Sequence, residues 1–237
     1  MSQARIILLF FPIFLLISKA KSQTADEIIQ KHIEAIGGYE KIKSIRTITF
    51  EGTNKSSKLE TSFKSYIIHD SAACTEGMAN GKPSKGIATK KEGWICPSGT
   101  ESKKSSNKKS KYEIKRDQKA LDIHGPLIDY AEKGNTIKYL GIEKINDTAY
   151  YKIKLKRADK SQYIYYFDNT SYIIKRVVSL WPGGNQPELT CDYTYKAFDN
   201  GLSFVVRSVR IEDGLVTTYS NYIVNPEIDR SIFNPCK

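Results

Sequence analysis

The sequence lacks the residue patterns of the common enzyme and metal-binding classes. Histidine is scarce, and His32, His69 and His124 are dispersed along the chain in no spacing typical of a metal site. The chain contains no G-x-S-x-G, H-E-x-x-H, G-x-x-x-x-G-K-S/T or G-x-G-x-x-G motif. We therefore predict a protein that is not an enzyme, with no catalytic residue, no metal and no cofactor. A hydrolase is the minor alternative.

Cysteine is also scarce, and the four cysteines are Cys74, Cys96, Cys191 and Cys236. No two of them stand in C-x-x-C spacing, which argues against a zinc knuckle or a thioredoxin-type redox site. An even number of cysteines in an exported chain usually forms disulfides, and three pairings are possible. Proximity in the sequence favours Cys74–Cys96 with Cys191–Cys236. Free, buried thiols are the alternative.

Long apolar runs are absent except at residues 6–17. That run follows Arg5 and precedes Ala20-Lys21-Ser22, the order of a signal peptide and its cleavage site. Twelve residues span about 18 Å as a helix, against about 30 Å of bilayer hydrocarbon, so a membrane anchor is the weaker alternative. The prediction is a signal peptide over residues 1–22, followed by a single exported domain over residues 23–237.

Acidic residues are fewer than basic ones, 26 against 37, which gives a formal charge of +11. Loss of residues 1–22 would remove three basic residues and leave +8. Five lysines opposed by one glutamate supply half of that excess within residues 101–111: Lys103, Lys104, Lys108, Lys109 and Lys111. An excess confined to one loop does not favour nucleic acid as a partner. It indicates either a basic contact loop for an anionic membrane surface or acidic partner, or a solvated loop.

Two helices are expected. Thr24 and Glu27 form a capping box, and isoleucines at helical spacing follow until Gly37-Gly38, which predicts an amphipathic helix over residues 25–36. Residues 39–44 extend it by a turn. Residues 97–112 have no apolar periodicity and are typical of a surface loop, and a short mid-chain helix is expected over residues 113–121.

The rest of the chain alternates apolar and polar residues with the period of strands. Turns such as Asn200-Gly201 and Asp213-Gly214 separate these segments, which indicates an antiparallel meander. The predicted strands cover residues 45–53, 58–69, 72–79, 92–96, 136–145, 149–157, 162–167, 172–179, 189–198, 202–211 and 215–224. The fold class is mainly β (α+β): a long curved antiparallel sheet that forms an incomplete β-barrel, its concave face covered by the two helices.

Helices set into such a sheet leave room for a cavity that holds a hydrophobic ligand. The candidate lining residues share apolar strand faces: Ile48, Phe50, Tyr151, Ile153, Leu155, Val205, Val209 and Ile211. Six tyrosines between residues 150 and 172 are typical of half-buried strands and can also line a cavity, with base stacking as the alternative.

Several segments resemble a known family. They are residues 24–42, Glu92-Gly93-Trp94, residues 125–135 with their continuation into 140–153, and residues 223–233. Together they are similar to bacterial outer-membrane lipoprotein-sorting proteins (LolA/LolB-like). The resemblance implies a single periplasmic half-barrel domain whose apolar interior accepts the acyl chains of lipoproteins without catalysis or a cofactor.

Two hypotheses for function follow. The first is an exported carrier, expected to be a monomer, that binds lipoprotein acyl chains or another hydrophobic ligand in an apolar cavity. The second is a cell-envelope interaction module of the same fold with a filled core, which would use the lysine-rich loop as its contact surface.

Overall fold

Thirteen strands form one antiparallel sheet in the computed structural model, which describes residues 23–57, 60–79, 81–97, 107–181 and 186–235. The predicted signal peptide lies outside the described residues. Across the sheet the order is β6-β5-β4-β3-β2-β1-β13-β12-β11-β10-β9-β8-β7. The strands are β1 (Thr47–Lys55), β2 (Glu60–Ile68), β3 (Ala72–Ala79), β4 (Lys82–Thr89), β5 (Gly93–Pro97), β6 (Asn107–Lys108), β7 (Thr136–Ile145), β8 (Thr148–Lys156), β9 (Gln162–Asp168), β10 (Ile174–Leu180), β11 (Pro187–Ala197), β12 (Ser203–Arg210) and β13 (Val216–Val224).

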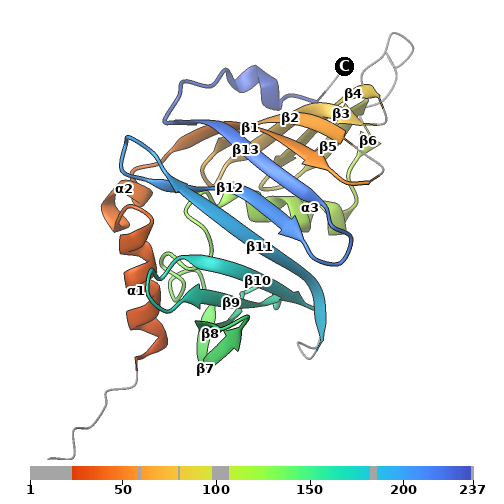
Figure 1. Ribbon diagram of the computed structural model, residues 1–237. Coiled ribbons are helices and arrows are strands. Elements are labelled where there is room, and N and C mark those ends of the chain that lie inside the picture. The colour runs from red at the N-terminus through yellow and green to blue at the C-terminus, as the bar shows by residue number, and fades with distance from the viewer. Residues whose placement is uncertain (1–22, 58–59, 80, 98–106, 182–185, 236–237) are drawn as a thin grey trace, which may run out of the picture.

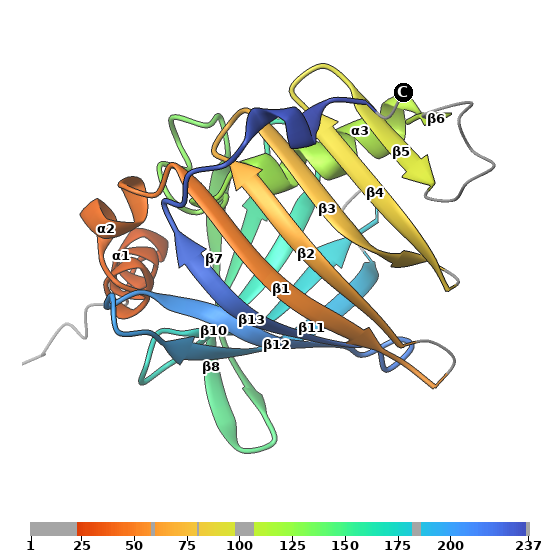
Figure 2. The same ribbon diagram turned by 90° about the horizontal axis from the view of Figure 1, so that it is seen from above.

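The sheet curves into a trough without closing (Figure 1). β13 returns to pair with β1, so the N-terminal and C-terminal halves of the meander join at the centre of the sheet. The two edges are β6 and β7, and they do not pair with each other in the described part of the chain. Seen from above, the two halves face each other across the trough (Figure 2). The predicted fold class, an incomplete antiparallel β-barrel with a few short helices, is confirmed.

The short helices are α1 (Ala25–Ala35), α2 (Tyr39–Lys43), α3 (Lys111–Gln118), η1 (Lys119–Leu121) and η2 (Arg230–Phe233). The predicted capping box begins α1: Thr24 Oγ accepts from the Glu27 amide, and the Glu27 carboxylate accepts from the Thr24 amide. Gly37 follows α1 with φ of +130°, a conformation that side-chain-bearing residues rarely adopt. α2 and α1 lie together at one end of the trough (Figure 2). Within the described residues, no helix has both the length and the apolarity to cross a membrane.

The main core fills the concave side of the sheet. α1 contributes Ile28, Ile29 and Ile33, and β8 contributes Ile153 and Leu155, each with an exposed fraction of 5% or less. A second, smaller core lies on the outer face, where side chains of β3, β4 and β5 pack against η2. The C-terminal segment therefore covers part of the convex face and leaves the trough to α1, α2 and α3.

β4 is the strand that the sequence pattern missed. Its sequence contains Pro83 and Gly86 among lysines, and only Ile87 and Ala88 are buried. Such a strand has little apolar alternation of its own, and it is held by continuous pairing with β3 on one side and β5 on the other. The expected loop over residues 97–112 is likewise interrupted, because β6 and the start of α3 lie within it.

The predicted disulfide pairing is wrong, because Cys74 and Cys191 carry free thiols. Cys74 opposes Ile87 on β4, and β4 separates it from β5, which carries Cys96. Two strand spacings amount to roughly 9–10 Å, beyond the Cα separation of about 7 Å that a disulfide can bridge. Cys191 is on β11, five strands across the sheet from β3. Cys236 lies outside the described residues.

Cys74 is expected to resist alkylation in the native protein. It is fully buried, and burial raises the pKa of its thiol from 9.0 to about 11, which lowers the reactive thiolate fraction about 100-fold. Mass spectrometry after timed treatment with iodoacetamide at pH 8 should show Cys74 labelled at least about 100-fold more slowly than in denaturant. The partly exposed Cys191 serves as the internal comparison. Similar labelling of Cys74 in native and denatured protein would contradict its burial.

Candidate ligand-binding cavity

An apolar cavity opens into the concave face of the sheet, and its first lobe has a volume of about 380 Å³. The lobe lies between the end of α1, the segment after η1 and strands β9 to β11. Its walls are mostly aliphatic and aromatic: His32, Ile33, Ile36, Pro126, Leu127, Ile128, Tyr163, Tyr165, Ile174, Val177, Tyr193 and Tyr195. Lys119 and Arg157 supply the charged groups of its wall.

A second lobe of about 350 Å³ lies under α2, β1 and β12. The two lobes share Ile36, His124 and Tyr195, so they adjoin. Aromatic rings form part of the second wall: Tyr222 stacks on Phe50 at a centroid distance of 5.3 Å and on Phe204 at 4.6 Å. The Tyr222 hydroxyl donates to the Val205 carbonyl at 2.7 Å, which fixes the ring. The two lobes are therefore neighbours on the concave side of the sheet.

Tyrosine rings form the part of the first lobe's wall that the sheet contributes. Tyr163 and Tyr165 are on β9, and Tyr193 and Tyr195 are on β11, so each pair projects from alternate positions of its strand. Burial raises the pKa of Tyr165, Tyr193 and Tyr195. These phenols are therefore neutral at pH 7, and they offer a hydrophobic ligand an uncharged surface with hydroxyl groups.

His32 is the buried polar group contributed by α1. Its Nδ1 lies 2.9 Å from the Tyr172 carbonyl oxygen, which only accepts, so Nδ1–H is the donor. The imidazole also meets the edge of Phe167 at a centroid distance of 5.3 Å. Desolvation by burial lowers the pKa of His32 to about 4, so the ring is neutral at pH 7. The cavity wall thus carries no imidazolium charge from α1.

A polar pocket of about 540 Å³ adjoins the apolar cavity. It shares Arg157 with the first lobe and Asp122 with the second. Charged groups of both signs line it, among them Lys90, Lys133 and Asp159. The arrangement places an apolar space next to a charged one, which suits a ligand with a hydrophobic body and a polar end.

The structure places the predicted lining residues in three groups. Ile48, Phe50 and Val205 line the second lobe. Ile153 and Leu155 face the same concave side but are fully enclosed in the main core, with no exposed surface. Tyr151 packs against that core and stacks on Tyr172 at 5.7 Å. Strand parity therefore selected the correct face but did not separate packed residues from the lining ones.

Val209 and Ile211 were predicted to line the cavity, and the structure places both outside it. Tyr195, which lines the cavity, opposes Val205, whereas Tyr193, which also lines it, opposes Ser208. The shift in register between these pairs breaks the alternation of β12, so Val209 is turned to the opposite face. Ile211 follows the end of β12 and is 51% exposed. Neither residue lines the cavity.

Sequence reasoning missed many of the cavity residues, among them Ile36, Val177 and the β11 tyrosines. The signal for the tyrosines is present, because Tyr193 and Tyr195 alternate in the same manner as the predicted residues of β1. Ile36 belongs to the apolar stripe of the predicted helix. Its place in both lobes follows from the packing of α1 at one end of the trough, which the helical periodicity alone does not specify.

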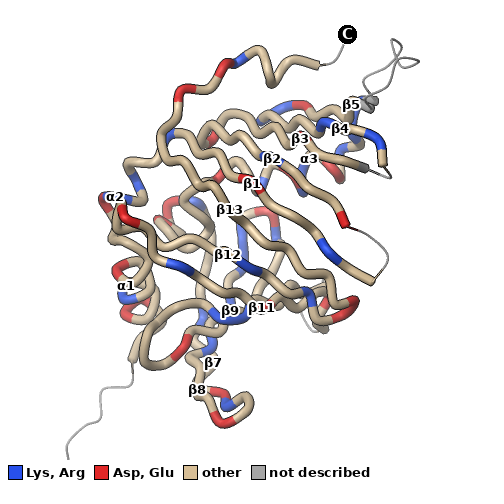
Figure 3. The backbone as a smooth tube through the Cα atoms, turned by 45° about the horizontal axis from the view of Figure 1, so that its top comes forward, with Lys and Arg blue, Asp and Glu red and all other residues tan. Residues whose placement is uncertain are grey.

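The predicted basic contact loop is only partly described. Lys103 and Lys104 lie outside the described residues. Lys108 is on β6, where its ammonium lies 2.7 Å from the Glu92 carboxylate, and Lys111 is exposed at the start of α3. Acidic and basic residues are interspersed over the molecule (Figure 3).

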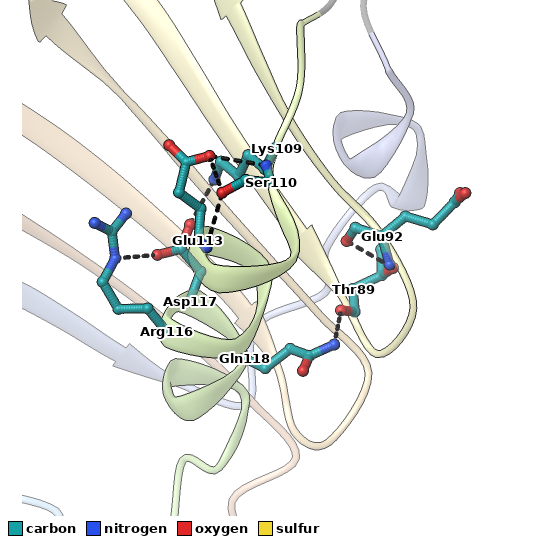
Figure 4. Close-up of polar contacts among 8 residues, drawn as sticks. All are labelled: Thr89, Glu92, Lys109, Ser110, Glu113, Arg116, Asp117 and Gln118. Carbon is teal, nitrogen blue, oxygen red and sulfur yellow. Dashed lines mark hydrogen bonds and ion pairs between the residues drawn. The ribbon is translucent and has the colours of Figure 1, made fainter. Parts of the chain in front are cut away.

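Lys109 was predicted to belong to the basic contact loop, and the structure buries its side chain instead. Its side chain is 8% exposed, and its ammonium lies 2.7 Å from the Asp117 carboxylate on α3, which also accepts from Arg116 (Figure 4). The same figure shows the capping box of Ser110 and Glu113 that begins α3. A buried, paired lysine cannot contact a membrane or a partner. Lys109 instead anchors α3 to the sheet.

Comparison with known proteins supports the fold. No protein-family model and no curated protein sequence matches the chain. A LolA superfamily protein from Nitrosomonas europaea superposes with a TM-score of 0.59 at 13% identity, over 90% of this chain and 98% of that one. A DUF1329 family protein from Desulfovibrio piger superposes with a TM-score of 0.50 at 12% identity, over 87% and 95%. The chain therefore has a LolA-like fold, as the sequence resemblance predicts.

Proposed function

We propose that this protein is an exported, non-enzymatic carrier that binds one hydrophobic or acylated ligand in the two-lobed cavity. The observation that carries the proposal is the pair of adjoining apolar lobes, about 380 and 350 Å³, on the concave side of a LolA-like fold. Together they fall within the range of volumes typical of small-molecule sites. Export is supported by the predicted signal peptide over residues 1–22.

The driving force for binding would be burial of alkyl chain. Each methylene removed from water contributes about 0.8 kcal/mol, so ten methylenes contribute about 8 kcal/mol before the cost of ordering the ligand. Neutral tyrosines and isoleucines provide the walls for such a chain. The polar pocket at Arg157 lies next to the first lobe, where it would accept the polar end of the ligand.

The specific form of this proposal is a periplasmic protein that carries lipoprotein acyl chains toward the outer membrane. The sequence resemblance to lipoprotein-sorting proteins supports it, since a LolA-like fold by itself does not identify a ligand. The filled-core interaction module has less support. A filled core would leave no two-lobed cavity. In addition, Lys109 of the proposed contact loop is held in a buried ion pair and is not free to contact a partner.

The direct test is the recovery of lipid from native protein and the displacement of a fluorescent fatty-acid probe. Purified protein should release acylated or alkyl compounds on organic extraction, as identified by mass spectrometry. It should also raise the fluorescence of the bound probe, which palmitate then displaces. Absence of both lipid and probe binding would overturn the carrier proposal.

Replacing Ile36 by Trp is expected to weaken probe binding about tenfold or more, because the indole would occupy space in both lobes. Ile223→Trp is the matched control, since Ile223 is 55% exposed on β13 and away from the cavity. Titration of the probe into both variants gives the two affinities, and circular dichroism confirms that each is folded. Equal affinities in the two variants would place the bound probe elsewhere.

A further inference from the structure

The fold brings together three potential metal ligands that are scattered in the sequence. His69 directly follows β2, and Asp122 and His124 follow η1. One ligand atom from each of the three lies within 4.8 Å of the others. The two imidazole rings are 3.8 Å apart between centroids and tilted by 31°. Two of the dispersed histidines of the sequence therefore form one cluster.

Backbone hydrogen bonds hold the two segments in place. The His69 amide donates to the Arg46 carbonyl at 2.8 Å, and the Asp70 amide donates to the Leu121 carbonyl at 2.8 Å. The second of these bonds joins the turn after β2 to the end of η1. The cluster is thus fixed by the main chain on both sides, which limits how far the three side chains can separate.

Both imidazoles present an unused nitrogen. Nε2 of His124 lies 3.0 Å from the Ile45 carbonyl oxygen, which only accepts, so Nε2–H donates and the lone pair of the neutral ring is on Nδ1. That Nδ1 is buried without a hydrogen-bond partner in the described structure, and so is Nδ1 of His69. A buried polar atom without a partner is destabilising, and two in contacting rings require an explanation.

We propose that His69, Asp122 and His124 bind a divalent transition-metal ion of the zinc type. Two imidazole nitrogens and one carboxylate are a ligand set that suits Zn²⁺ and leaves coordination positions for solvent. The bond from His124 to the Ile45 carbonyl is the outer hydrogen bond that metal-binding histidines usually make, since it fixes the tautomer and the ring.

The charged groups around the cluster leave room for this ion. Lys133 donates to the two oxygens of Asp122 at 3.0 and 2.8 Å. Each of these oxygens keeps a lone pair for a metal ion. His69 and Asp122 also line the polar pocket, which gives the ion a path from solvent.

The test is metal titration of the untagged protein, first stripped with a chelator. Calorimetry should show one Zn²⁺ bound per chain, and Co²⁺ should give visible absorption bands. His69→Gln should weaken Zn²⁺ about tenfold or more, as expected when a ligand is lost. Asp199→Asn, which alters an exposed carboxylate outside the cluster, should leave the affinity unchanged.

Circular dichroism and urea denaturation show whether each variant is folded, so loss of metal binding is separated from loss of structure. If His69→Gln does not fold, Asp122→Asn takes its place, with the same expected loss. Absence of 1:1 binding by the wild-type protein, or a smaller loss in the folded ligand variant, overturns the metal site. Neither result bears on the carrier proposal, which has its own probe.

Discussion

Replacing Ile153 by Ala is expected to lower the free energy of unfolding by about 3 kcal/mol, within the usual range for such a truncation in a packed core. Ile153 is on β8 with no exposed surface, and it is paired with Tyr139 on β7 and Tyr165 on β9. The loss would combine the transfer energy of the removed methylenes with the cost of the space left behind. Urea denaturation at pH 7.5 measures the change.

The matched control is Ile142→Ala on the neighbouring strand. Ile142 is on β7 and is 60% exposed, so its truncation should change the free energy of unfolding by less than about 0.5 kcal/mol. A loss below about 1 kcal/mol in Ile153→Ala would mean that the site is not tightly packed. Tighter probe binding in the same variant would then show that Ile153 borders the ligand space rather than the core.

The alternation of residues along a strand predicts which face of the sheet a side chain occupies. It does not predict whether that side chain lies in the packed core or lines the cavity. The alternation of apolar and polar residues predicted β7 and β3 with their observed bounds, 136–145 and 72–79. This works because apolar side chains point to the packed face of a strand and polar side chains to the solvent. Ile153 and Ile48 both face the trough, as predicted. Ile48 lines the second lobe, whereas Ile153 is enclosed in the main core.

Irregular pairing explains the errors of register and connectivity. The shift opposite Tyr195 turns Val209 away from the cavity, although its spacing from Val205 predicts the same face. The unrecognised β4 separates Cys74 from Cys96, although their proximity in the sequence favoured a bond. Both errors arise because one extra residue or one extra strand alters geometry without leaving a strong apolar pattern.

The histidines show a different limit. Sequence spacing detects metal sites whose ligands lie on one turn or one helix face, and His69 is in a separate segment from Asp122 and His124. Their meeting depends on the turn after β2 lying against the end of η1. The third histidine, His32, is buried on α1 with 4% of its surface exposed, which has a consequence for stability.

Acidification from about pH 6.5 to pH 4 is expected to cost about 3 kcal/mol of stability through His32 alone. Burial lowers its pKa from 6.5 to about 4. Between these values the unfolded chain binds a proton that the folded chain does not, so the free energy of unfolding falls as the pH falls. Each tenfold difference in proton affinity between the two states corresponds to about 1.4 kcal/mol. Urea denaturation across this range, with a chelator present, measures the slope.

His32→Asn isolates this contribution, because the Asn amide can replace the Nδ1–H donor toward the Tyr172 carbonyl without titrating. The variant should lose most of the pH dependence even if its stability at pH 7.5 is lower. A residual slope of the same sign is expected from His69 and His124, whose pKa values are also lowered by burial. If wild type and His32→Asn lose stability in parallel as the pH falls, His32 is solvated and charged, and α1 cannot be packed against the sheet as described.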